Sequence, residues 1–548
     1  MSAFLAALPI LLVLVLMLGL GWPASRAGIA GATLALAVAL FGFGLGTEVL
    51  PEVGVAGSLG GVAAEATFTS ATILWIILPA LAIYHLQVAT RGTDVLRVAL
   101  GKLSDDPRIL ALLIAWFFTL FMEGGAGFGS PVALAAPFLV GIGYKPLVAV
   151  VIAMIGNAVG VSFGAIGTPV VPMVATTGLD PLDLSAASAT YHLAFGVVPL
   201  VMMMFLASRG TGTRMTGAIW IWTLFAAAAF LVPMWLLATF VGPELPTLGG
   251  ALVGGAAFVA VLLLVRRLRP QATAPTLAQE SPDGAGSPGD DADPAGDDAD
   301  RAGGNAGAQA SDAPPIDDVE ADRAALLRAA APYLILISLV LATRLVPFIA
   351  EPLDAVELSW NLDGGFTGSF RPLTHPGTLL VVSFLLGALA QRARTPTIGG
   401  ALTTTVKQLI PVTIALLAML LLARTMVRSG MTEELAVAAA GSAASAWPVL
   451  APLVGVLGTF VTGSGTASNV LFTDLQVATA EQLGYPQLPL LGAQNFGASV
   501  GNAIAPHNIV AGGATVGLTG SEAEVMRRTI GFSLVYGLLG GGLALLLV

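Results

Sequence analysis

A single carboxylate, Glu123, stands in a long apolar stretch and is followed at once by residues that interrupt helices. The stretch 121–138 reads FMEGGAGFGSPVALAAPF, with four glycines and a proline directly after the acid. A carboxylate that is removed from water favours its protonated form, so it can take up and release a proton. Glu123 is therefore a candidate for carrying a proton or holding a coupling ion. The alternative is that it hydrogen-bonds to neighbouring amides and only fixes the loop.

A second segment of the same character, 460–509, lies in the C-terminal part of the chain. Within it, Asp474 is a candidate second coupling acid, or else a packing residue whose carboxylate is satisfied locally. His507 lies at the end of the segment and is a candidate binding residue. Two other histidines, His192 and His375, are expected at helix edges.

Small polar side chains gather around both glycine-rich segments. Interrupted helices expose backbone N–H groups and a partial positive charge at their N termini, which suits a carboxylate. The alternative for many of these residues is that they let helices pack closely. Polar side chains deep in a membrane are costly and usually face a bundle interior or a water-filled path. The candidate substrate-binding residues are Gly125, Gly127, Ser130, Asn157, Ser162, Thr168, Thr462, Ser464, Thr466, Ser468, Asn469, Asn495, Asn502 and His507.

Other cations give weaker indications. Arg344 lies near the end of an apolar window, where a long side chain can reach the interface, and a substrate role is the alternative. Lys407, Arg424 and Arg428 are expected at the interface.

The composition excludes several kinds of chemistry. The chain has no cysteine, which removes disulfides, thiolate metal sites and cysteine nucleophiles, and its four histidines form no metal-binding pair. An intramembrane enzyme would have to use Glu123 with His507 or His192, and no nucleophile motif supports it. We therefore expect neither an enzyme nor a metal or organic cofactor.

The elements that position these residues are membrane helices. Of 548 residues, 56% are hydrophobic and only 10% are charged, whereas a soluble protein carries about 25% charged residues. Many windows reach the roughly 20 apolar residues that a bilayer-spanning helix needs, and together they predict an all-α polytopic protein with about 11–14 transmembrane helices. The first window lacks a basic leading region, so we expect a retained helix and not a signal peptide.

Basic residues predict which loops are cytoplasmic. They cluster near 91–108, 209–214, 266–269, 323–328 and 392–394. Counting crossings back from these loops places the N terminus outside.

An acidic stretch divides the chain. Residues 270–323 are rich in Asp, Gly, Ala and Pro and cannot form a core, so we expect a disordered cytoplasmic linker, with an acidic regulatory segment as the alternative. It separates an N-terminal transmembrane half, 1–269, from a C-terminal half, 324–548. The segments 121–170 and 460–509 match each other at several positions, which favours duplication, and duplicated halves with broken helices are typical of secondary transporters.

The same segments carry a family resemblance. The blocks 69–86, 121–147, 157–170, 339–347, 462–484 and 504–522 resemble the L-lactate permease family. The resemblance implies uptake of lactate or glycolate across the plasma membrane together with protons. It also implies a fold in which two inverted repeats bring re-entrant hairpins to one central site. His507 and Asp474 depart from the expected family pattern, and the linker is an insertion.

The resemblance sets the remaining expectations. A small monocarboxylate and the lipid bilayer are the expected partners, with no nucleic acid, and a homo-oligomeric state is left open. The co-transported ion is expected to be H⁺, with Na⁺-coupled transport of another organic anion as the alternative. A passive channel is a further alternative, although duplicated broken helices suit alternating access better.

Overall fold

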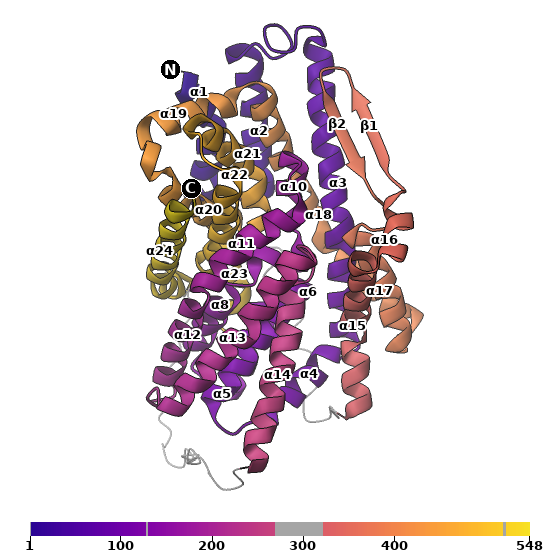
Figure 1. The fold of residues 1–548 in the computed structure, drawn as a ribbon, viewed down its shortest axis with the longest axis vertical. Helices are drawn as coiled ribbons and strands as arrows, with labels where there is room; N and C mark the ends of the chain where they lie inside the picture. The colour runs from indigo at the N-terminus through magenta and orange to yellow at the C-terminus, as the bar shows by residue number, and fades with distance from the viewer. Residues whose placement is uncertain (1, 128–129, 269–321, 519–521) are drawn as a thin grey trace, which may run out of the picture.

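The computed structural model describes residues 2–127, 130–268, 322–518 and 522–548, and these form a bundle of helices elongated along one axis (Figure 1). Within these ranges, nine helices are long and apolar enough to cross a membrane, or eleven if two bent pairs each count as one span. The all-α polytopic fold class is thereby confirmed. The predicted linker, apart from residues 322 and 323, lies outside the described residues.

The first half contains fourteen α-helices in the described ranges. They are α1 (Ser2–Leu18), α2 (Ala24–Gly42), α3 (Gly54–Ala89), α4 (Gly92–Gly101), α5 (Pro107–Ala111), α6 (Thr119–Gly125), α7 (Ser130–Gly141), α8 (Pro146–Asn157), α9 (Gly164–Gly167), α10 (Val171–Thr177), α11 (Pro181–Phe195), α12 (Val197–Gly210), α13 (Gly217–Phe240) and α14 (Pro246–Leu268). A π-helical segment, η1 (Leu112–Phe118), joins α5 to α6, and a 3₁₀ turn, η2 (Val161–Phe163), precedes α9.

The second half begins at α15, whose first turn is capped by the carboxylate of Asp322. Its α-helices are α15 (Arg323–Leu345), α16 (Pro347–Asp354), α17 (Pro376–Ala390), α18 (Thr395–Arg428), α19 (Met431–Ala443), α20 (Trp447–Thr462), α21 (Gly465–Leu483), α22 (Gln487–Gly501), α23 (Pro506–Ala514) and α24 (Glu522–Leu547). Two 3₁₀ turns, η4 (Ala444–Ala446) and η5 (Asn502–Ile504), lie between helices.

The basic loops meet at one end of the bundle. The guanidinium of Arg108 donates to the backbone carbonyl of Arg214 at 2.9 Å, and Arg266 at the end of α14 donates to the carbonyl of Leu103. Figure 1 places α4, α5 and the end of α14 together at the bottom and the N terminus near the top. Loops that are distant in the sequence therefore share the end that their charge predicts to be cytoplasmic.

A β-hairpin lies between α16 and α17. Strands β1 (Leu358–Leu362) and β2 (Phe366–Phe370) pair antiparallel, and the turn between them has positive φ at Gly364 and Gly365. The hairpin lies along α3, where Trp360 packs edge-on against Phe68 (Figure 1). The sequence Asp-Gly-Gly at 363–365 is typical of a hairpin turn, and the sequence analysis did not predict this hairpin.

The two glycine-rich segments have the same order of local elements. In each, a helix ends, a second helix runs to a Gly-Tyr pair, a third helix starts next to a proline, and a 3₁₀ turn follows. The glycine of each pair has positive φ, at Gly143 and at Gly484. The common order agrees with the expected duplication, although it does not establish an inverted relation between the halves.

Two ion pairs in the described part of the chain contain a buried acid. Glu65 on α3 pairs with Arg428 at the end of α18, and Arg428 also lies over the ring of Phe366. Glu244, between α13 and α14, pairs with Arg344 of α15 at 2.5 Å. Both arginines lie in the last turns of their helices, in keeping with the expectation of helix ends, and there they neutralise acids that the sequence analysis did not single out. A buried carboxylate needs such a partner.

We expect Glu65→Leu to lower the thermal unfolding midpoint of the detergent-solubilised protein. Removing one partner of a buried pair costs about 3–5 kcal/mol, and the 26% exposure of Arg428 moves the expected loss toward the lower end. The double variant Glu65→Leu/Arg428→Met should lose less than the single variant, because no charge is then stranded. The exposed pair Arg371–Glu357 offers the control, Glu357→Leu, for which little change is expected. A double variant less stable than Glu65→Leu would contradict this account.

Candidate functional site

The two interrupted regions meet in the middle of the bundle. In the first half the chain leaves α8 at Asn157 and passes through η2 and α9 before α10 begins. In the second half α20 ends at Thr462, and α22 ends at Gly501. The irregular segment 158–168 lies between α6 on one side and α22 on the other. Its backbone groups must be satisfied by neighbouring protein, because lipid offers no hydrogen bonds.

Glu123 lies at the end of α6 and is buried, with only 4% of its surface exposed. The side-chain amide of Asn157 donates to its Oε2 at 2.7 Å. The amide oxygen of Asn157 is buried and has no hydrogen-bond partner. The structure thus brings the predicted residues Glu123 and Asn157 together, and the amide oxygen of Asn157 is an unpaired acceptor next to the carboxylate.

Glycines shape the space around this carboxylate. A Cβ at Gly164 would lie 2.2 Å from Oε1 of Glu123, and one at Gly127 would lie 3.4 Å from the same atom. On the opposite edge, a Cβ at Gly160 would lie 3.4 Å from Cγ of Glu123. The two contacts at 3.4 Å are ordinary van der Waals distances, so it is the glycine at 164 that lets the carboxylate approach the backbone of segment 158–168.

The end of this segment has an unusual backbone. Ala165, Ile166 and Gly167 all have φ between 43° and 77°, so the short element α9 is a left-handed turn. This conformation is unfavourable for the two non-glycine residues, and such strain persists only where surrounding structure enforces it. One such contact comes from the second half, where Asn469 donates to the carbonyl of Pro169 at 2.9 Å.

Ser162 links the two halves through both its backbone and its side chain. Its N–H donates to Oγ of Ser499 at 3.0 Å, and its hydroxyl contacts the backbone carbonyl of Asn495 at 3.1 Å. The hydroxyl also contacts Nε2 of His192 at 2.8 Å. Oγ of Ser499 in turn donates to the carbonyl of Ala158. Segment 158–168 is therefore held by α22 of the other half.

Amide side chains extend this cluster into the second half. Asn495 accepts from Asn469 at 2.9 Å and donates to Ser188 of α11 at 3.0 Å. Gln494 accepts from Gln476 at 3.0 Å. These groups are fully buried, and a hydrogen-bonded network of this kind positions its members much more firmly than isolated contacts do.

The remaining candidates have different contacts. Thr168 and Thr466 contact each other across the halves, and Gly125 lies against Tyr333 of α15, also across the halves. Ser468 bonds to Gly455 within the second half. Asn502 accepts from Asn508, and Ser464 caps the start of α21. The side chain of Ser130 lies outside the described residues.

The second break is more accessible than the first. Thr462, Gly463 and Ser464 are half-buried and His507 is exposed, while Glu123 and Gly127 are buried. A Cβ at Gly463 would lie 3.1 Å from Cβ of His507, so the histidine stands directly at this break.

Asp474 lies apart from the cluster around Glu123. The charges that act on it belong to Arg424, Arg428 and Glu65, and no hydrogen bond joins it to the amide network in the described residues. Arg424 itself donates to Thr176 at the end of α10.

Sequence reasoning missed several members of the site and misplaced one. His192 was expected at a helix edge, but it is fully buried and contacts Ser162. Ser188, Gln494, Ser499 and Tyr536 were not predicted at all. Asn495 and Ser499 of α22 lie four residues apart and share one helix face, which was the available signal.

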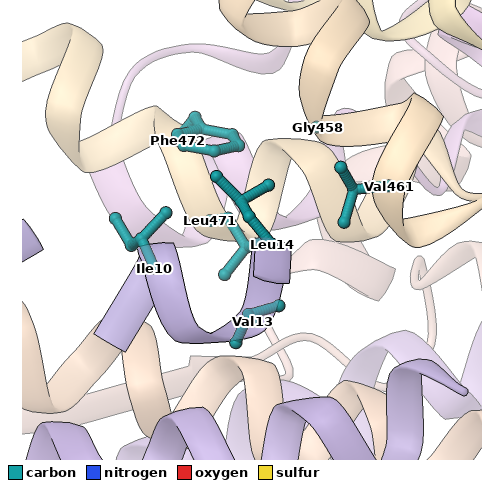
Figure 2. Close-up of a pocket in the computed structure, with 7 residues that line it drawn as sticks. All are labelled: Ile10, Val13, Leu14, Gly458, Val461, Leu471 and Phe472. Atoms are coloured by element: carbon teal, nitrogen blue, oxygen red, sulfur yellow. The ribbon is translucent and has the colours of Figure 1, made fainter. Parts of the chain in front are cut away.

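An apolar pocket elsewhere does not fit a polar solute. Figure 2 shows Ile10, Val13 and Leu14 of α1 facing Val461 of α20 and Phe472 of α21. No side chain lining it can donate or accept a hydrogen bond, so this pocket is not the candidate site for a polar solute.

Comparison with known proteins identifies the family. A family model described as L-lactate permease matches residues 2–548. The chain belongs to the L-lactate permease family. Glycolate permease GlcA of Escherichia coli (strain K12) is 28% identical, covering 100% of this chain and 95% of that protein. L-lactate permease of Streptococcus iniae is 29% identical, covering 88% and 91%.

Membership of the L-lactate permease family makes this chain a multi-pass membrane transport protein and not an enzyme. Its fold resembles that of Neisseria gonorrhoeae MtrF, whose structure was described for a class of antimetabolite efflux pumps. The TM-score is 0.51 at 15% identity, with 94% of each chain covered. The likeness concerns the fold alone, over 94% of the chain, and says nothing about substrate.

We expect Gly164→Ala to destabilise the protein and displace Glu123. The added Cβ would lie 2.2 Å from Oε1, and overpacking of this kind costs about 1–3 kcal/mol. Gly141→Ala is the matched control, because no atom lies within 4 Å of its added Cβ. Thermal unfolding of both variants in detergent makes the comparison. Equal midpoints for the two variants would show that the carboxylate is not held against this backbone.

Proposed function

We propose that this protein takes up L-lactate, glycolate or a related 2-hydroxymonocarboxylate across the plasma membrane by proton symport. The observation that carries the proposal is the buried Glu123, which lies against the same irregular segment that presents Ser162 to the other half. Relatives named L-lactate permease and glycolate permease support the substrate class.

The polar cluster suits a small, singly charged acid. Backbone N–H groups, hydroxyls and amides of both halves surround Ser162 and Asn495. No lysine or arginine hydrogen-bonds to these groups within the described residues, so a substrate charge would be balanced by dipoles and by a co-transported cation. A second carboxylate would be costly to desolvate in such a site.

Glu123 is the proposed proton carrier. Its Oε2 accepts from Asn157, and its Oε1 lies against Gly164 on segment 158–168. Protonation would remove the negative charge next to the segment that receives the anion. Binding of substrate and proton would then favour each other, as symport requires.

We further propose alternating access, and the way the halves are joined supports it. Four hydrogen bonds between segment 158–168 and α22 would have to break or exchange for one half to move against the other. We propose that the halves are inverted repeats and that these contacts close the empty site. The half-buried break at Thr462–Ser464 beside His507 is the proposed entry.

Sodium coupling is the second candidate, on one specific observation. The unpaired amide oxygen of Asn157 lies beside the Glu123 carboxylate, and Na⁺ binds oxygen ligands of this kind. Proton and sodium gradients imposed separately distinguish the two.

We expect wild-type protein in proteoliposomes to accumulate labelled L-lactate when a proton gradient is imposed and not when a sodium gradient is imposed. Glu123→Gln should lose accumulation at least tenfold, because the amide cannot release a proton. It should retain lactate–lactate exchange, since the amide resembles the protonated acid. Glu433→Gln, at an exposed acid, is the matched control. Sodium-driven accumulation in the wild type would show that Na⁺, and not H⁺, is the coupling ion. Proton-driven accumulation by Glu123→Gln would show that Glu123 is not the proton carrier.

The orientation in the plasma membrane gives a further prediction. We propose that the N terminus lies outside and the basic end lies in the cytoplasm. Because the chain has no cysteine, single substitutions can be labelled without altering a background. Ser2→Cys and Asp363→Cys should react with an impermeant maleimide on intact cells, and Lys102→Cys only after lysis. The reverse pattern would invert the proposed orientation.

A further inference from the structure

A chain of hydrogen bonds runs from the C-terminal helix to Ser162. The phenol of Tyr536 on α24 contacts Nδ1 of His192 at 3.1 Å, and Nε2 of His192 contacts Oγ of Ser162 at 2.8 Å. Oγ of Ser162 also contacts the backbone carbonyl of Asn495 at 3.1 Å. The chain therefore joins α24, α11, η2 and α22.

The donor in each of these hydrogen bonds follows from the last group in the chain, the backbone carbonyl of Asn495. A backbone carbonyl can only accept, so the hydrogen between Ser162 and Asn495 belongs to the serine hydroxyl. Ser162 has no second hydrogen, so Nε2–H of His192 donates to it. Nδ1 of a neutral imidazole then has a lone pair, and it accepts from the hydroxyl of Tyr536.

The surroundings keep this arrangement in one form. His192 and Tyr536 are both fully buried. The imidazole and the Tyr536 ring both pack against Phe496, with ring centroids 5.0 and 4.8 Å away. No carboxylate hydrogen-bonds to the imidazole in the described residues, so nothing here stabilises a doubly protonated ring.

We propose that Tyr536 and His192 fix the Ser162 hydroxyl as a hydrogen-bond donor, so that the site selects a substrate offering an acceptor there. This inference rests on the proposed function. In the empty protein the hydroxyl donates to the carbonyl of Asn495. A substrate carboxylate replaces that carbonyl, because a hydrogen bond to a charged acceptor is the stronger one. An amide that turns its N–H groups to Ser162 is rejected. His192 and Tyr536 are thus positioning residues that act through Ser162.

The test compares L-lactate with lactamide, which carries an amide in place of the carboxylate. For each variant, the inhibition constant of lactamide is divided by the KM for L-lactate uptake. Tyr536→Phe frees Nδ1, so His192 can take up the other tautomer and accept from Ser162. The serine oxygen then accepts an amide N–H, and the ratio should fall about fivefold or more.

Matched variants separate positioning from simple loss of structure. Tyr191→Phe removes a different buried phenol, on α11, which donates to the carbonyl of Pro489 at 2.7 Å and packs on Phe496. Its ratio should equal that of the wild type. His192→Gln keeps a donor toward Ser162 and an acceptor toward Tyr536, so it should retain the ratio that His192→Leu loses. An unchanged ratio in Tyr536→Phe and His192→Leu would overturn the proposal.

A spectroscopic measurement tests the inference without relying on the substrate. In ¹⁵N-histidine-labelled protein, the signals that disappear in His192→Leu belong to this ring. We expect a neutral ring protonated at Nε2 in the wild type and a tautomer mixture in Tyr536→Phe. A ring protonated at Nδ1 in the wild type would overturn the hydrogen-bond directions even if L-lactate proved not to be transported. Failure of lactate uptake with the expected signals would count against the proposed substrate alone.

Discussion

The need to satisfy the backbone of segment 158–168 inside the bilayer governs the rest of this site. A helix satisfies its own N–H and C=O groups, but an irregular segment cannot, and lipid offers no substitute. Here the partners come from other elements: Ser499 takes both the N–H of Ser162 and the carbonyl of Ala158, and Thr247 takes the carbonyl of Gly160. The halves of the protein are joined because one half completes the hydrogen bonding of the other.

The same constraint explains the position of Glu123. The glycine at 164 lets the carboxylate lie against the irregular segment, and Ser162 of the same segment contacts α22. A change of charge at Glu123 therefore acts on backbone that also determines where Ser162 points. In the proposed mechanism this shared backbone couples proton and substrate without any contact between the proton carrier and α22.

Around this centre, buried charges fix the surrounding helices. Glu65 and Arg428 join α3 to α18, and Glu244 and Arg344 join the α13–α14 connection to α15. The second pair is close to the site, because Glu244 lies between Pro243 and Thr247 in the sequence. Pro243 lies against Gly167, and Thr247 donates to the carbonyl of Gly160. The ion pair thus anchors the short connection that covers one side of the irregular segment.

The sequence by itself determined the class of protein and the two segments that form its candidate site. Composition and hydrophobic length predicted membrane helices, and a lone acid among glycines marked the first break, because such residues are costly in a bilayer unless they have a function or a partner. The pairing of Glu123 with Asn157 could have been predicted from the sequence, because both are polar residues in one apolar segment.

Only the tertiary structure decided how the segments meet. His192 and Tyr536 occupy ordinary helical positions, and nothing local distinguishes a buried histidine that contacts Ser162 from one at a helix edge. The arginines at 344 and 428 looked interfacial because their acidic partners are 100 and 363 positions away. Periodicity reports which residues share a helix face, but contacts between distant helices depend on packing, which one sequence does not specify.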